Sequence, residues 1–192
     1  LWGAQTQRSI RNFTIGEELI PIELIYSITL IKKAAANANF KLGLIDKVKK
    51  DLIIEACTEI IAGKHDSQFP LKIWQTGSGT QTNMNINEVI SNIASLKKNS
   101  ELGSHYPIHP NDDVNKSQST NDTFPAAIQI SVVAEIIKKL VPSINELTIV
   151  LDRKSNEWEN LIKIGRTHFQ DAVPISLGQE VSAWSQQLKD AK

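Results

Sequence analysis

The sequence predicts an all-α protein, in which a loop-rich helical first part is followed by the start of a bundle of long helices. Apolar residues recur at spacings of three and four in almost every apolar stretch, which is the period of an α-helix. Strand signals are weak, and residues 72–74 are the best short candidate. The late helical stretches are long and follow one another closely, which is typical of a bundle. We therefore expect two domains, an N-terminal helical domain at residues 1–118 and the first, truncated part of a central helical bundle at residues 119–192.

Three helices are expected in the N-terminal domain. The first begins at Pro21, a residue suited to a first helical turn, and closes in an alanine-rich stretch at residues 34–36. The second has Asp46 as its N-cap and Gly63 as its stop. The third follows the loop at residues 77–83. The positions expected to line the inward faces of these helices are Ile22, Ile25, Tyr26, Thr29, Leu52, Ile53, Ala56, Ile60, Ile86, Val89, Ile90, Ile93 and Leu96.

Three more helices are expected in the bundle part. A fourth helix covers residues 122–140, and Pro142 restarts a fifth that ends near Ile164. Residues 165–177 are expected to form a loop. The sixth helix begins near Gly178 and is still in progress at the last residue. Because the chain also begins within a polar tract instead of with methionine, we expect it to be a piece of a longer protein.

Composition and charge exclude several classes of function. Lysine plus arginine equal aspartate plus glutamate at 21 each, so the net charge is zero, and no basic run points to a nucleic-acid partner. No stretch is long and apolar enough to span a membrane. Cys57 is the only cysteine, which excludes an intramolecular disulfide and favours the reducing cytoplasm, with the mitochondrial matrix as an alternative. It falls on an apolar helix face, so we interpret it as a structural thiol, and no group of residues has metal-ligand spacing.

Three tracts rich in hydroxyl and amide side chains are set between the apolar stretches, at residues 77–85, 109–122 and 165–171. Such side chains are costly to bury unless their hydrogen bonds are filled. Many uncharged donors with few fixed charges suit a small ligand that carries carboxylates. Taken one at a time, the tracts are also explained by helix capping and turn formation, which are the more common roles of these residue types.

The first two tracts each precede a predicted helix, whose N-terminal N–H groups offer a site for an anion. In the first tract, glycines allow the backbone to approach a ligand, and Ser78 and Thr80 add hydroxyl donors. It is not a phosphate loop of the Gly-x-x-x-x-Gly-Lys type, because no lysine follows. In the second tract, residues 117–122 offer hydroxyl and amide groups just before a helix, and residues 109–112 form a turn that can either cap or bind.

The third tract holds the strongest candidate for acid–base chemistry. His168 is the one histidine that is flanked by other reactive side chains, which makes it the best general acid or base. The alternative for a lone histidine is a structural role. Arg166 can grip a carboxylate through its forked guanidinium group. We interpret His65 and His105 as solvated residues of polar loops.

Together the tracts resemble those of the class II fumarases, of the fumarase/aspartase superfamily, and the resemblance covers nearly the whole chain. The matching motifs are long and occur in the order that the family has. They include Trp2-Gly3-Ala4-Gln5-Thr6-Gln7-Arg8-Ser9, Gly165-Arg166-Thr167-His168 and Leu177-Gly178-Gln179-Glu180. Three features favour the fumarases over the aspartases: the tract at residues 77–81, the pair Asp113 and Lys116, and His168, where aspartases carry glutamine.

The resemblance implies a carbon–oxygen lyase of the tricarboxylic acid cycle, which reversibly hydrates fumarate to (S)-malate without a metal or an organic cofactor. It also implies a homotetramer whose subunits share their active sites, with a dicarboxylate as the small-molecule partner. The alternatives are an aspartase or another lyase of the superfamily, and a non-catalytic assembly protein of the same fold. The catalytic serine loop of the family lies in the C-terminal half, beyond these residues.

The resemblance assigns roles to individual residues as well. Thr167 and His168 match the catalytic pair contributed by a neighbouring subunit, with His168 as the acid–base group that handles the water or hydroxyl at C2. Residues 106–108 are Tyr-Pro-Ile, where some family members are basic. The substrate-binding residues are Ser78, Gly79, Thr80, Ser119, Thr120, Asn121 and Thr167, and an accessory dicarboxylate site is implied at His109, Pro110, Asn111 and Asp112.

Overall fold

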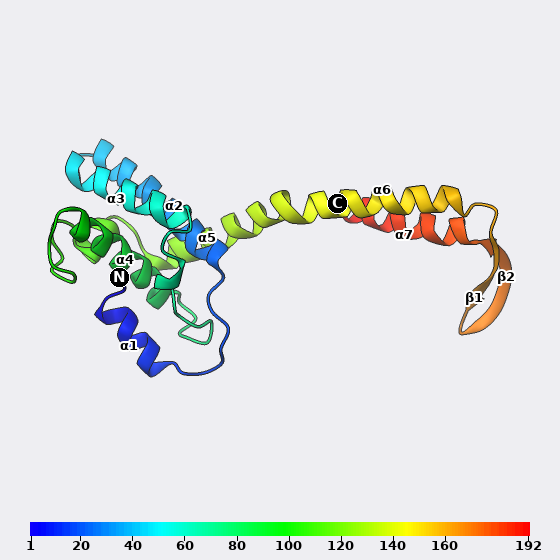
Figure 1. The fold of residues 1–192 in the computed structure, drawn as a ribbon, viewed down its shortest axis with the longest axis horizontal. Coiled ribbons are helices and arrows are strands. Elements are labelled where there is room, and N and C mark those ends of the chain that lie inside the picture. The colour runs from blue at the N-terminus through cyan, green and yellow to red at the C-terminus, as the bar shows by residue number, and fades with distance from the viewer. The chain divides into compact units, whose positions relative to one another are not determined.

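The structure is a computed structural model that describes all of residues 1–192 and is built mainly of helices (Figure 1). Its main elements are α1 (Ala4–Asn12), α2 (Ile22–Lys41), α3 (Lys47–Ile61), α4 (Thr80–Lys97), α5 (Thr120–Glu135), α6 (Val141–Glu157), β1 (Ile162–Thr167), β2 (Gln170–Ser176) and α7 (Leu177–Ala191). Short 3-10 or π-helical segments are η1 (Asp66–Gln68), η2 (Pro110–Val114) and η3 (Ile136–Leu140). The helical architecture confirms the predicted fold class, to which the structure adds one β-hairpin. The chain divides into two compact units, residues 1–131 and residues 132–192.

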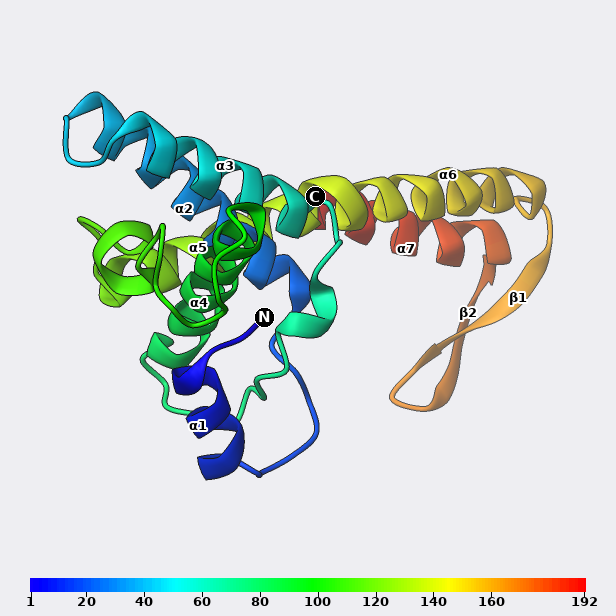
Figure 2. The same ribbon diagram turned by 60° about the vertical axis from the view of Figure 1, so that its left-hand side comes forward.

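In the unit at residues 1–131, α2 and α3 lie side by side and α4 packs against both (Figure 2). Cys57 is completely buried between them, and burial raises the pKa of its thiol to about 12, which supports its interpretation as a structural thiol. Leu96 was expected in this core but is 51% exposed, because the last turn of α4 extends into solvent. The buried apolar positions that were predicted correctly are Ile25, Leu52, Ile53, Ala56, Ile60, Ile86, Val89, Ile90 and Ile93.

The ends of α2 and α3 show how far the local sequence determines these helices. Asp46 caps α3 as predicted, because its Oδ1 accepts a hydrogen bond from the backbone N–H of Lys49 at 2.9 Å. Gly63 lies just after the end of α3 with a φ of +76°, a conformation that favours glycine. In contrast, α2 continues to Lys41 instead of ending near residue 36. Alanine is the strongest helix former, so the alanine-rich stretch extends the helix and does not end it.

Helix α1 was not predicted, because its cap comes from a distant part of the chain. Its N-cap residue, Gly3, has no side chain to offer. The buried carboxylate of Glu88, on α4, accepts hydrogen bonds from the N–H groups of Gly3 at 3.0 Å, Gln5 at 2.8 Å and Thr6 at 3.1 Å. Thr6 Oγ1 donates to the same carboxylate at 2.6 Å. A negative group here satisfies the free N–H groups of the first turn and complements the helix dipole.

We expect Glu88→Gln to lower the free energy of unfolding by about 1.5–3 kcal/mol, the range for a hydrogen bond to a charged group. Glutamine has the same size, but an NH₂ group that only donates replaces one of the two accepting carboxylate oxygens. Glutamine also carries no charge to complement the helix dipole. A urea titration measures the change. Glu101→Gln, at an exposed carboxylate in the loop after α4, is the matched control and should shift the free energy by less than about 0.5 kcal/mol. Equal effects of the two substitutions would contradict the capping role.

The division between the two compact units falls inside α5. Phe124 and Ala127, in the first turns of α5, pack on the core of residues 1–131. The sequence placed the boundary earlier, between residues 118 and 119, where a polar tract gives way to a helical pattern. Packing of the first helical turns, which the polar tract does not reveal, sets the limit of the compact unit. The domain boundary itself stays a prediction.

Helical residues run without a break from Thr120 to Glu157, through α5, η3 and α6. The predicted restart of the helix at Pro142 is therefore wrong. Pro142 stands in the first turn of α6, directly after the π-helical segment η3. Proline lacks an N–H donor and its ring displaces a carbonyl of the preceding turn, and the wider π turn accommodates both effects. No helix has the length and the apolar composition that crossing a membrane requires.

Residues 162–176 form a hairpin, where the end of a helix and a loop were expected. Helix α6 ends at Glu157, and β1 pairs antiparallel with β2. Ile162 and Ile164 alternate along β1, which is the β-branched pattern of a strand. This pattern covers few residues and leads into a polar tract, and for that reason the helical period was extended over it in error.

In the unit at residues 132–192, α6 and α7 lie side by side (Figure 1). Ser176 caps α7 through a reciprocal pair of bonds, since its Oγ accepts from Gln179 N at 3.0 Å and Gln179 Oε1 accepts from Ser176 N at 2.9 Å. Gly178 is required where the helices meet, because a Cβ atom there would lie 2.4 Å from the carbonyl oxygen of Ser155. The start of the sixth predicted helix near Gly178 is confirmed.

Candidate active site

The first polar tract contains Gly79, which is the N-cap of α4 and has a φ of +71°. A Cβ atom at this position would lie 2.3 Å from the ring of Phe124, on α5. Glycine is therefore required by the left-handed backbone and by the close packing of the ring. Ser78 and Thr80, on either side of it, are exposed, and their hydroxyl oxygens lie 3.3 Å apart. The N-terminus of α4 thus presents two hydroxyl groups to solvent.

The second polar tract meets the first within the same unit. Asn83, in the first turn of α4, donates from Nδ2 to Thr120 Oγ1 and to Asn115 Oδ1, both at 3.0 Å. Thr120 begins α5, and its neighbours on both sides are exposed. The structure thus brings together the substrate-binding candidates of the two tracts: Ser78, Gly79, Thr80, Ser119, Thr120 and Asn121. We call this set the hydroxyl cluster.

The hydroxyl cluster has the chemistry of an anion site without a fixed charge of its own. Two helices, α4 and α5, begin at it, and a helix N-terminus favours negative charge through its free N–H groups. Serine and threonine hydroxyls add donors that rotate to suit a ligand. Such a set can bind a carboxylate and stabilise negative charge that develops on it.

The polar network of the cluster continues to Lys32, on α2. This side chain is completely buried, and its Nζ donates to Asn115 Oδ1 at 2.8 Å. Burial lowers the pKa of Lys32 to about 7, because the charged form loses its hydration. Sequence reasoning missed this residue. The signal was a lysine at helical spacing from Ile25 and Thr29, on the inward face of its helix.

The lowered pKa of Lys32 predicts a pH dependence of stability. Between the folded pKa of about 7 and the ordinary value of 10.5, the unfolded chain binds a proton that the folded chain does not. Stability therefore rises with pH in this window and is lowest below pH 7, where the buried ammonium is charged. We expect the free energy of unfolding of the wild type, relative to Lys32→Met, to rise between pH 7 and about pH 8.5.

Urea titrations of both proteins at the two pH values measure this difference. The range stops short of pH 9, the ordinary pKa of the Cys57 thiol, because that group has the opposite effect. Its pKa is raised on folding, so its contribution to stability falls as the unfolded thiol ionises. A difference between wild type and Lys32→Met that does not change with pH would contradict the prediction.

His168 and Phe169 form the two-residue turn of the hairpin in residues 132–192. Thr167 pairs with Gln170, and the two turn residues have φ values of +48° and +59°. This is the backbone of a type I′ turn, which favours asparagine and glycine. Histidine and phenylalanine are strained there by about 1–3 kcal/mol each, as is common at functional sites. Thr167 and His168 are thus exposed at the hairpin tip, in the other unit from the hydroxyl cluster.

Two further residues of the third tract shape this hairpin. The strand register slips at Gly165, where a Cβ atom would lie 2.7 Å from the carbonyl oxygen of Val173. Glycine is therefore needed at the bulge. Arg166, which was considered as a carboxylate ligand, donates from Nη2 to the carbonyl of Phe169 at 3.4 Å. In this structure it supports the turn, and its binding of a ligand stays a prediction.

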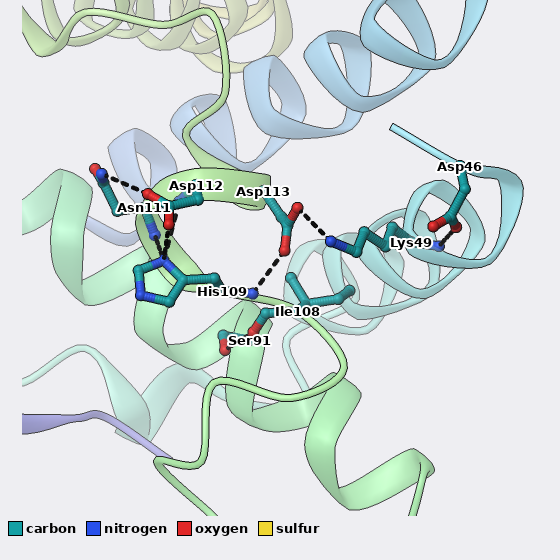
Figure 3. Close-up of polar contacts among 8 residues, drawn as sticks. All are labelled: Asp46, Lys49, Ser91, Ile108, His109, Asn111, Asp112 and Asp113. Carbon is teal, nitrogen blue, oxygen red and sulfur yellow. Dashed lines mark hydrogen bonds and ion pairs between the residues drawn. The ribbon is translucent and has the colours of Figure 1, made fainter. Parts of the chain in front are cut away.

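The accessory candidates form a tightly bonded turn (Figure 3). His109 caps η2, since its Nδ1 accepts from the N–H groups of Asn111 at 3.2 Å and Asp112 at 3.0 Å. An Nδ1 that accepts leaves the ring proton on Nε2. Asp113 joins the turn to α3, because it accepts from His109 N at 2.9 Å and pairs with Lys49 Nζ at 2.7 Å.

A cavity of about 500 Å³ lies beside this turn. His105 and His109 line it, with their rings edge to face and their centroids 4.5 Å apart. Asn111 and Pro110 also line the cavity, whereas no member of the hydroxyl cluster does. The cavity therefore belongs with the accessory candidates, and the hydroxyl cluster is a separate, open site.

The interpretation of His65 as solvated is wrong. Its Nε2 lies 3.0 Å from a carboxylate oxygen of Glu59, which also pairs with Lys97 at 2.8 Å. Hydrogen bonds from Lys97 and His65 lower the pKa of Glu59. The pairing joins a loop to two helices, which a local sequence pattern cannot show. His105 is exposed as predicted, and no group of three or more His, Cys, Asp or Glu side chains is placed to hold a metal ion.

Comparison with curated proteins gives close relatives of the whole chain. The chain is 87% identical to fumarate hydratase class II of Prochlorococcus marinus subsp. pastoris (strain CCMP1986 / NIES-2087 / MED4), over 100% of the chain and 42% of that protein. It is 52% identical to fumarate hydratase class II of Staphylococcus aureus (strain COL), over 97% of the chain and 40% of that protein. The chain thus spans well under half of the length of these relatives.

Solved structures share the same fold. A class II fumarase from Schistosoma mansoni matches with a TM-score of 0.93 and 50% identity, covering 99% of this chain and 40% of that one. A fumarate lyase:delta crystallin from Brucella melitensis matches with a TM-score of 0.93 and 40% identity, covering 98% of this chain and 44% of that one. The family whose model matches residues 1–192 is described as lyase, and the chain therefore belongs to this lyase family.

Proposed function

We propose that the full-length protein, a chain of its relatives' length that contains residues 1–192, is a class II fumarate hydratase. It hydrates fumarate reversibly to (S)-malate, a step of the tricarboxylic acid cycle. The observation that carries the proposal is the hydroxyl cluster at the N-termini of α4 and α5. The identity of 87% to a fumarate hydratase of Prochlorococcus marinus supports the choice of substrate.

The chemistry of the cluster fits this reaction. Removal of a proton next to a carboxylate builds an aci-carboxylate, in which a second negative charge develops on the carboxylate oxygens. In the proposal, the proton goes to the catalytic serine loop in the C-terminal half of the full-length protein. Donors that are already in place where that charge develops lower the barrier, because they do not have to reorganise. In the proposal, Ser78 and Thr80 donate from their hydroxyls to this carboxylate, together with the first N–H groups of α4. Thr120 donates to the other carboxylate of the substrate, whose charge does not change in the reaction.

His168 is the proposed acid–base group. It transfers a proton to or from the oxygen at C2, and Thr167 beside it binds the substrate. The exposure of His168 and the strained turn that presents it support this role. We propose that Thr167 and His168 act in the active site of a neighbouring subunit, where they face the hydroxyl cluster of another copy.

We also propose a homotetramer. The helices α5, η3 and α6 carry many exposed apolar side chains, and exposed apolar surface in this amount marks an interface between protein chains. Light scattering of the full-length protein measures the assembly. The exposed apolar residues are Ile128, Ile130, Val132, Val133, Ile136, Ile137, Leu140, Leu147, Ile149 and Val150.

Proton transfer by His168 at the oxygen and by the serine loop at the carbon, with charge stabilisation by neutral donors, supplies the chemistry, so we propose that the reaction uses neither a metal nor an organic cofactor. The single, buried cysteine fits a reducing compartment, and we propose the cytoplasm. The turn at residues 109–112 and its cavity are the proposed accessory dicarboxylate site, outside the catalytic steps.

The experiment that tests the function uses the full-length protein. Interconversion of fumarate and malate is followed by the ultraviolet absorbance of the fumarate double bond, with aspartate as the control substrate. Activity on malate and none on aspartate is the expected result. Activity on aspartate would move the assignment to an aspartase, and activity on neither would favour a non-catalytic protein of this fold.

A further inference from the structure

Lys32 is a fully buried lysine whose hydrogen bond goes to an amide and not to a carboxylate. Its Nζ donates to Asn115 Oδ1 at 2.8 Å, and it forms no ion pair. A buried ammonium group without a counter-charge is unfavourable for folding. A methionine of similar length would avoid this penalty, so packing alone gives no reason for a lysine at this position.

Two bonds hold the amide of Asn115 in one orientation, which then orients the amide of Asn83: Lys32 Nζ donates to Asn115 Oδ1, and Asn115 Nδ2 donates to the carbonyl of Gln118 at 3.2 Å. A protonated lysine carries only donors, so the atom of Asn115 that faces it is the carbonyl oxygen. The same oxygen accepts from Asn83 Nδ2 at 3.0 Å, which turns the NH₂ group of Asn83 to this side. Asn83 Oδ1 is buried and has no hydrogen-bond partner, so its amide is oriented by the NH₂ group alone.

This orientation decides what the hydroxyl of Thr120 can do. Asn83 Nδ2 donates to Thr120 Oγ1 at 3.0 Å, so the hydroxyl oxygen acts as an acceptor in that bond. The hydroxyl hydrogen is left to donate elsewhere. If the amide of Asn83 were reversed, its oxygen would take that hydrogen and the hydroxyl would have only lone pairs to offer to a carboxylate.

We propose that Lys32 is a positioning residue of the active site: through Asn115 and Asn83, it directs the hydroxyl hydrogen of Thr120 toward a substrate carboxylate. The inference rests on the proposed function, in which Thr120 binds the substrate. In the protonated form of Lys32, the positive charge at the start of the chain of bonds also polarises each of them and strengthens the last. Because a carboxylate is bound in the ground state as well as in the transition state, the effect falls mainly on KM.

The competing role for Lys32 is a structural tie. Asn39, on the same helix, donates from Nδ2 to the carbonyl of Lys116 at 3.0 Å, so α2 is already bonded to this loop at a neighbouring point. If Lys32 only added to that tie, its loss would lower stability and leave substrate binding in the folded protein unchanged. The two roles therefore differ in KM.

The test is Lys32→Met in the full-length protein, with malate as the substrate. We expect KM to rise by at least about 10-fold while kcat stays within about threefold of the wild type. The thermal midpoint should not fall, because a buried charge has been removed. Lys33→Met is the matched control, since the Nζ of Lys33 donates to Thr58 Oγ1, outside this network, and its KM should stay within about twofold. A KM of folded Lys32→Met within about twofold of wild type overturns the inference.

A double-mutant cycle with Thr120→Val tests the route. Valine has the shape of threonine without the hydroxyl, so Lys32→Met should raise KM no further in that background. A second rise of the same size there overturns the inference. If Lys32→Met does not fold, Lys32→Gln, which keeps a donor, takes its place with a smaller expected rise that also vanishes beside Thr120→Val. A wild type that is inactive on fumarate and malate overturns the proposed function, whereas an active wild type with an unchanged variant overturns only the role of Lys32.

Discussion

His168→Asn is expected to lower the turnover number of the full-length protein by at least about 100-fold, the scale of a positioned acid–base group. Asparagine cannot exchange a proton near neutral pH, whereas imidazole does so readily. The substitution suits the backbone, because position 168 has a φ of +48°, which asparagine adopts more easily than histidine. The loss of turnover should therefore come without a loss of stability or assembly. Fumarate absorbance gives the rate, and thermal unfolding and light scattering check the fold.

His109→Asn is the matched control, since it makes the same substitution at the histidine of the accessory turn. His109 caps η2 through its side chain, and asparagine is also a good cap. Its turnover should stay within about twofold of the wild type, because the cavity it lines is separate from the hydroxyl cluster. A loss at His109 as large as that at His168 would show that the roles of these two histidines are misassigned. A turnover of His168→Asn close to the wild type would remove His168 from the mechanism.

Helices α2, α3 and α4 could be predicted because what determines them is local. Their apolar residues keep the helical period, and Asp46 and Gly63 stand at the ends of α3 where a cap and a stop are expected. The error at the end of α2 has a local cause as well, since an alanine-rich stretch was taken as an end although alanine favours continuation.

Helix α1 and the hairpin could not be predicted in the same way. The first turn of α1 is capped by Glu88, which is far away in the sequence, so no pattern near Gly3 indicates a helix start. The hairpin depends on pairing between two short strands, and its turn uses His168 and Phe169 in place of the usual asparagine and glycine. Both elements are set by contacts and strain that only the folded chain reveals.

The candidate site also has a part that the sequence predicted and a part that only the structure revealed. Ser78, Thr80 and Thr120 could be picked out because they stand in hydroxyl-rich tracts directly before predicted helices, and in the structure Asn83 links the starts of those two helices. The support behind them could not, because Lys32 and Asn115 lie on different elements and their bond joins residues that are remote in sequence. Residue types therefore predicted the exposed hydroxyl groups, and packing was needed to find the buried groups that are bonded behind them.

Adding one methyl group at Gly79 is expected to lower the free energy of unfolding by about 2–5 kcal/mol, from two sources. The left-handed backbone, with a φ of +71°, disfavours alanine by about 1–2 kcal/mol. The new Cβ atom would lie 2.3 Å from the ring of Phe124, and overpacking of this kind costs about 1–3 kcal/mol. A urea titration measures the sum. KM for malate should rise as well, because Ser78 and Thr80 flank the residue that moves.

Gly77→Ala separates these effects from a general intolerance of the loop. It adds the same methyl group two positions earlier, where no atom lies within 4 Å of the added Cβ and φ is not positive, so stability should change by less than about 0.5 kcal/mol. Phe124→Leu then divides the two sources at Gly79. Leucine is smaller than the ring, so in the Gly79→Ala background it should recover the overpacking part and leave about 1–2 kcal/mol from the backbone. No recovery would mean that overpacking against the ring of Phe124 is not a source of the loss at Gly79, and that the left-handed backbone accounts for all of it.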